Sequence, residues 1–76
     1  MERREASVAA IRLLDEVAKL LKDPQLSFDF GRRGVNTSLA LTAVQGLVAY
    51  LEGNKARAAE DLSTVADEIR ARNERR

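Results

Sequence analysis

Apolar and polar residues separate onto two sides of a helix in the first third of the chain. When residues 4–22 are placed about 100° apart, as in an α-helix, charged side chains fill half of the circumference. Apolar side chains fill the other half, which is unusually wide: Ala10, Ile11, Leu13, Leu14, Val17, Ala18, Leu20 and Leu21. Pro24 then ends the pattern, because a proline pushes the residue before it out of the helical region. We therefore predict an amphipathic helix over residues 4–22.

Residues 38–52 are apolar around almost the whole circumference of a second predicted helix. Thr42, Gln45 and Glu52 form its narrow polar strip. A helix with so little polar surface needs neighbours on more than one side. We expect the first helix to cover one of these sides.

The ends and the middle of this second helix carry local markers. Asn36, Thr37 or Ser38 can cap its N-terminus, and Gly53 stands where a left-handed residue commonly ends a helix. Gly46 lies in the interior, where glycine costs about 1 kcal/mol relative to alanine. We interpret Gly46 as a point of close approach by another helix.

Residues 55–72 predict a third helix with a narrow apolar seam. The seam residues follow one another at spacings of four, three and four: Ala58, Leu62, Val65 and Ile69. Asn54 can cap this helix, and with Gly53 it makes a turn short enough for a helical hairpin. Residues 73–76 are predicted to be a frayed basic tail.

These elements predict one all-α domain over residues 1–76, a small three-helix bundle. A chain this short buries only about 60 % of its unfolded surface. It has no cysteine and no histidine, so neither disulfides nor the usual zinc ligands can stabilise it. The first two helices offer more apolar area than the third can cover. We therefore predict a homodimer.

The segment between the first two predicted helices has a different pattern. Apolar and polar residues alternate from Leu26 to Phe30, which indicates an extended backbone with one apolar edge. We predict an extended connector over residues 26–30, packed within the protomer or its dimer. A candidate protein-binding edge across residues 26–35 consists of Leu26, Phe28, Phe30 and Val35. Docking of a different protein on this edge, by strand addition or by an aromatic anchor, is the alternative.

Arg32 and Arg33 lie between two glycines, just before the second predicted helix. Free N–H groups and the helix dipole favour an anion there, so these arginines form a weak candidate anion site. The predicted order of one strand and two helices is similar to that of the ribbon–helix–helix family of DNA-binding dimers. That resemblance implies that Ser27 and Asp29 would face the bases, where the carboxylate of Asp29 repels phosphate.

The composition argues against a catalytic function. Without histidine or cysteine the chain lacks the commonest general base and the thiol nucleophile. Its adjacent carboxylates cannot face each other on a helix. We expect a protein that is not an enzyme, with no catalytic, cofactor or metal site and no small-molecule substrate.

The distribution of charge and of apolar residues limits the classes of partner that we expect. The 13 basic and 12 acidic residues are interspersed and leave a net charge of +1, so no basic field attracts nucleic acid. No apolar run reaches the roughly 20 residues that span a bilayer, and residues 1–7 lack the apolar core of a signal peptide. We expect a cytoplasmic protein with no membrane partner.

The leading functional hypothesis is a non-catalytic protein–protein interaction module that works as a homodimeric helical adaptor or assembly protein. The alternative is a small nucleic-acid-binding regulator that uses Arg32, Arg33 and the basic C-terminal tail.

Overall fold

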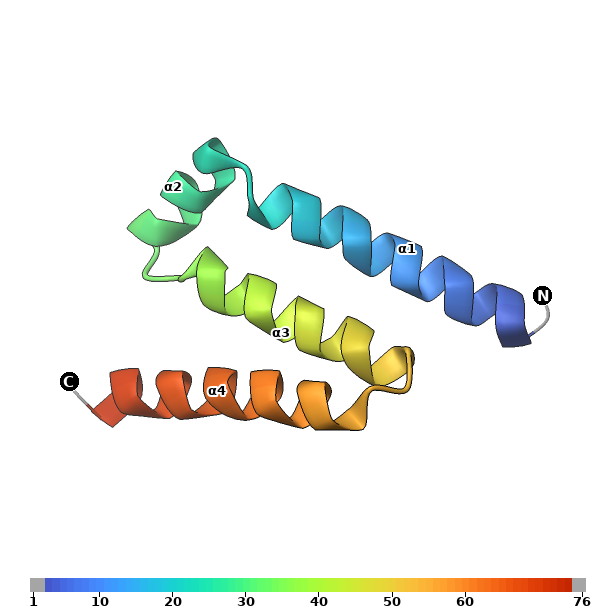
Figure 1. The fold of residues 1–76 in the computed structure, drawn as a ribbon. Coiled ribbons are helices and arrows are strands. Elements are labelled where there is room, and N and C mark those ends of the chain that lie inside the picture. Colours follow the sequence, from blue (N-terminus) through green and yellow to red (C-terminus); the bar gives the residue numbers. More distant parts are fainter. Residues whose placement is uncertain (1–2, 75–76) are drawn as a thin grey trace.

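The computed structural model describes residues 3–74, and this part of the chain forms four helices (Figure 1). In chain order they are α1 (Arg3–Leu21), α2 (Pro24–Arg32), α3 (Thr37–Leu51) and α4 (Lys55–Glu74). The all-α class is confirmed, since residues 3–74 contain no strand. The predicted count of three helices is wrong, and with the missing strand the resemblance to ribbon–helix–helix proteins loses its basis.

Three of the four helices lie where the hydrophobic pattern predicts them. The bounds of α1, α3 and α4 differ by at most two residues from the predicted ranges 4–22, 38–52 and 55–72. Helix α4 continues through the first two residues of the predicted tail at 73–76. Residues 75–76 lie outside the described part of the chain.

Helix α2 corrects the prediction of an extended connector at residues 26–30. Asp23 caps the helix, because its Oδ1 accepts a hydrogen bond from the backbone N–H of Gln25 at 3.4 Å. Pro24 takes the first helical position, where its missing N–H is no loss. Leu26 and Phe30 are four residues apart and half-buried, so they share the inner side of the helix. The proline therefore begins a helix as well as following one.

Helices α1, α3 and α4 lie side by side, with α3 in the middle and α2 across one end (Figure 1). Neighbouring helices of this layer run in opposite directions. Helix α3 contacts α1, α2 and α4, whereas α1 and α4 make no contact within residues 3–74. The described chain is therefore an open layer rather than a closed bundle, and it measures 46 × 28 × 16 Å.

Helix α4 approaches α3 closely at Gly46, as predicted. A Cβ atom on Gly46 would lie 3.0 Å from Cβ of Asp61 and 3.1 Å from Cγ of Leu62. Gly53 has a φ of +91°, which glycine tolerates best, and it leads the chain from α3 into the cap of α4. The Oδ1 of Asn54 accepts a hydrogen bond from the N–H of Arg57 at 3.2 Å. The predicted helical hairpin is confirmed.

The core is thin. The buried apolar side chains of the described part are Ala49, Ala58 and Val65, and no large side chain is fully buried there. The chain exposes 6089 Å², whereas a compact monomer of 8.4 kDa exposes about 4,600 Å². Its radius of gyration of 14.1 Å also exceeds the roughly 11 Å of a compact domain of this length. An isolated chain therefore leaves much apolar surface in water.

Candidate protein-binding face

The exposed apolar residues of α1 form a row along one side of the helix. Leu13, Val17 and Leu20 follow at spacings of four and three, and each is exposed, up to 68 % for Leu13. Half-buried Leu14 and Leu21 face α3 instead. We call the row of Leu13, Val17 and Leu20 the α1 ridge.

The same side of the layer continues as apolar surface over α3 and α4. Leu47 is exposed and lies four residues, about one helical turn, after Ala43, so both residues point to the same side of α3. On α4, Leu62 and Ile69 remain exposed. We call the combined surface the apolar face, and it consists of Leu13, Val17, Leu20, Leu47, Leu62 and Ile69.

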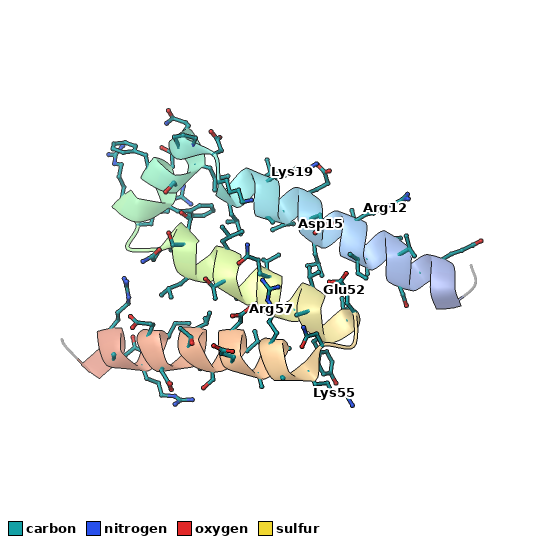
Figure 2. All side chains as sticks on the ribbon, viewed as in Figure 1. Arg12, Asp15, Lys19, Glu52, Lys55 and Arg57 are labelled. Carbon is teal, nitrogen blue, oxygen red and sulfur yellow. The ribbon has the colours of Figure 1, made fainter. Side chains whose placement is uncertain are left out.

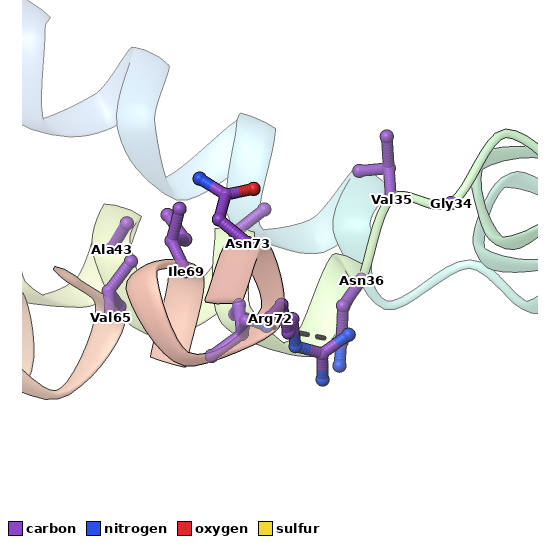
Figure 3. Close-up of a pocket in the computed structure, with 10 residues that line it drawn as sticks. Gly34, Val35, Asn36, Ala43, Val65, Ile69, Arg72 and Asn73 are labelled. Carbon is purple, nitrogen blue, oxygen red and sulfur yellow. Dashed lines mark hydrogen bonds between the residues drawn. The ribbon is translucent and has the colours of Figure 1, made fainter. Parts of the chain in front are cut away.

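A groove of about 360 Å³ opens between α3 and α4, next to the α2 end of the layer (Figure 3). We call it the α3–α4 groove, and its apolar lining is Val35, Leu39, Ala40, Ala43, Val65 and Ile69. Arg72 and Asn73 lie near one end of it, at the C-terminal turn of α4. Small residues of α3 and a short row of branched residues of α4 therefore make an apolar hollow with a polar edge.

The opposite side of the layer carries charged residues. A smaller groove there has an apolar floor of Ala18, Val44, Val48 and Ala49 and is edged by Asp15, Gln45, Glu52 and Arg57, of which Figure 2 labels Asp15, Glu52 and Arg57. Glu52 is nine residues from Ala43, or about 2.5 helical turns, so these residues lie on opposite sides of α3.

Helix α1 also has a polar side and an apolar side, and these match the two sides of α3. Residues two positions apart point about 200° away from each other on a helix. Leu13 and Val17 each lie two positions from Asp15, which lines the polar groove. They therefore point away from the polar side, so the α1 ridge and the α3–α4 groove belong to the same face.

The residues of the predicted protein-binding edge at 26–35 do not form one edge. Leu26 and Phe30 are half-buried on the inner side of α2, whereas Phe28 is 62 % exposed on the outer side. Val35 lies in the loop before α3 and lines the α3–α4 groove. The structure therefore brings Val35 to the apolar face and leaves Phe28 as a separate exposed aromatic residue.

Arg32 and Arg33 lie at the C-terminal end of α2. The guanidinium of Arg32 stands 6.0 Å from the ring centroid of Phe28, in the range of a cation–π contact. Asp29 lines an open hollow together with both arginines. At the start of α3, the Oδ1 of Asn36 accepts hydrogen bonds from the N–H groups of Ser38 and Leu39, at 2.8 and 3.3 Å. These N–H groups already have an acceptor, and the anion site stays a prediction.

None of the six residues of the apolar face was among the protein-binding residues predicted from the sequence. For the α1 ridge, the sign in the sequence is the unusual width of the apolar half of the first helix, which exceeds what a single neighbour covers. Within residues 3–74 no three acidic side chains gather as metal ligands would.

Comparison with known protein families, curated proteins and solved structures finds no match to this chain.

No one helix among residues 3–74 combines the length and the apolarity needed to cross a bilayer. Helices α2 and α3 meet both conditions when they are taken together, but they are bent by 114° at the loop between them.

Proposed function

We propose that this chain is a non-catalytic protein–protein interaction module that works as a homodimer. The observation that carries the proposal is the excess of about 1,500 Å² of accessible surface over that of a compact monomer of this mass. A stable interface takes about 800 Å² from each partner. The excess is therefore large enough to supply an interface, and the apolar face is the surface that supplies it.

The composition of the apolar face supports the proposal. Interfaces that persist have centres poor in charge and rich in apolar side chains. Exposed aliphatic side chains follow one another across all three helices on this face, whereas the groove on the other side has the charged residues Asp15, Glu52 and Arg57 at its edge. A net charge of +1 gives two copies little reason to repel each other. The proposal includes a reducing compartment such as the cytoplasm, which suits a chain without cysteine.

The surroundings of Arg32 and Arg33 favour this function over nucleic-acid binding. A site for a nucleic acid backbone needs basic side chains that are free to neutralise phosphates. Here Asp29 shares the surface of both arginines, and Phe28 lies under Arg32.

The test is the mass in solution. We expect sedimentation equilibrium at micromolar concentration to give about twice 8.4 kDa. Leu13→Glu should halve this mass, because it places a charge on the most exposed residue of the apolar face. Gln45→Glu is the matched control, since it adds the same charge on the polar side of the layer and should leave the dimer intact. A wild-type chain that remains a monomer would contradict the proposed function.

A further inference from the structure

We infer that the occupant of the apolar face is a second copy of this chain, and that Leu20, at the C-terminal end of the α1 ridge of each copy, inserts into the α3–α4 groove of the other. This inference rests on the proposed homodimer and specifies its contact. Each chain thus places this end of its ridge in the groove of the other, and the two ridges do not contact each other.

The shapes of the two surfaces are complementary. Leu20, at the C-terminal end of the α1 ridge, has 58 % of its surface exposed, so its side chain is free to enter a groove. The groove is hollow because α3 contributes Ala40 and Ala43 to it. Its volume of about 360 Å³ is more than twice the roughly 150 Å³ that accommodates a benzene-sized group in an apolar cavity. The groove therefore has room for aliphatic side chains from a ridge.

The layer places ridge and groove so that a two-fold axis can exchange them. The ridge lies on one flank of α3 and the groove lies on the other, on the same face of the layer. A two-fold axis that runs along α3, above this face, carries the α1 ridge of one copy over the groove of its partner. The same rotation carries the partner's ridge over the first groove, so the contact is closed and self-complementary.

The ridge and the groove also lie at matching positions along the axis of α3. Asp15 and Ala18 of α1 line one groove with Val44 and Val48 of α3, so these segments lie at the same level. Helices α1 and α3 run in opposite directions (Figure 1), which places Leu20 at the level of the N-terminal half of α3. The α3–α4 groove lies at this level, since Leu39 and Ala43 line it. Rotation about an axis along α3 preserves the level, so Leu20 reaches the groove of the partner.

The accessible area and the rim fit a second copy. The exposed excess of about 1,500 Å² per chain covers the roughly 800 Å² that each partner contributes to a standard interface. Arg72 and Asn73 give the groove a polar rim at its end, as interfaces with an apolar centre have.

Cysteine cross-linking tests the exchange, because the natural chain has no cysteine. Chains with Leu20→Cys are mixed with chains that carry Ile69→Cys in the groove, and the mixture is oxidised. Both positions are exposed, so the substitutions should leave the fold intact. We expect a disulfide-linked product of dimer mass in the mixture and little cross-linking of either chain alone. A mixture of Leu20→Cys with Gln45→Cys, on the polar side, is the matched control and should not react.

A charge pair tests the same contact without a covalent bond. Leu20→Lys and Ile69→Glu should each make the protein monomeric, since each puts an unpaired charge into both contacts of the dimer. In a mixture of the two variants, the introduced lysine of one chain meets the introduced glutamate of the other, while the second contact remains wild-type. We therefore expect the mixture to recover the dimer mass, and Gln45→Lys alone to retain it.

The outcomes separate this inference from the proposed function. A monomeric wild-type chain overturns both, and it would leave the apolar face to a different partner. A wild-type dimer in which Leu20→Cys reacts with itself, or in which the mixed charge pair stays monomeric, overturns the exchange of ridge and groove alone. A wild-type dimer with the mixed disulfide and the rescued charge pair supports both.

Discussion

At Gly46, helices α3 and α4 pack so closely that a methyl group on Gly46 would be crowded by Asp61 and Leu62. The contact joins the backbone of α3 to Asp61 and Leu62 of α4, and Asp61 Cβ cannot move away without moving the helix that carries it. This explains why an apolar helix retains a residue that weakens it by about 1 kcal/mol relative to alanine. The benefit is a closer packing of α3 on α4.

We expect Gly46→Ala to lower the free energy of unfolding by about 1 kcal/mol. Overpacking of a tight contact costs about 1–3 kcal/mol, which outweighs the gain of about 1 kcal/mol in helix propensity. Urea denaturation at a fixed protein concentration measures the change. Gly31→Ala in α2 is the matched control, because nothing lies within 4 Å of its added Cβ. It should stabilise the protein by about 0.5 kcal/mol, and equal effects of both substitutions would contradict the close contact.

At the scale of elements, α2 shows where sequence patterns become ambiguous. The alternation in residues 26–30 fits a strand, but Leu26 and Phe30 are also four residues apart, which fits one side of a helix. Five residues cannot separate these two periods. The dipeptide Asp23-Pro24 resolves them, since an aspartate cap followed by a proline starts a helix.

The other helices could be predicted because their determinants are local. Apolar patterns of fifteen residues or more define α1, α3 and α4, and the caps at Asn36 and Asn54 depend on neighbours two or three residues away. The sequence indicates that the chain has an excess of apolar area, but it does not indicate where on the surface this area lies. An excess of apolar area is visible in α1, whereas its position depends on α1 and α4 lying on opposite flanks of α3.

The two phenylalanines of α2 provide a test of its orientation. Phe30→Ala should lower the free energy of unfolding by about 2 kcal/mol, because the ring is half-buried and full burial is worth about 3–5 kcal/mol. Phe28→Ala should cost less than about 0.5 kcal/mol, since most of its ring is in water. Thermal or urea denaturation of the two variants measures the difference. A larger loss for Phe28→Ala would mean that the outer side of α2 is the packed one.

At the scale of the whole molecule, the charged residues Asp15, Glu52 and Arg57 lie on one side of the layer and the apolar face lies on the other. A helix layer 16 Å thick has no interior of its own beyond the seams between its helices. For this reason the described part contains no fully buried large side chain, although its sequence is 45 % hydrophobic. Pairing of two layers would create that interior.

Stability should therefore depend on protein concentration. If folding and pairing are coupled, each tenfold rise in concentration adds about 0.7 kcal/mol per chain, or about 4 °C in Tm for a chain of this length. Circular dichroism melts at two concentrations a hundredfold apart measure this dependence. The Leu13→Glu variant should melt at a lower temperature that does not change with concentration. A Tm of the wild-type chain that is equally insensitive would contradict the coupling.

The central place of α3 also sets an order of events. Every contact between helices in the described part joins α3 to a neighbour, apart from the one between α1 and α2. Helices α3 and α4 meet through a turn of three residues, Glu52 to Asn54, so their hairpin closes with little loss of chain entropy. Contacts between segments close in the sequence form faster than contacts between distant ones, so we expect α1 to dock on α3 after the α3–α4 hairpin has formed. On this expectation the α3–α4 groove forms early and the α1 ridge takes its place last, so the docking of α1 is the step after which a chain can pair.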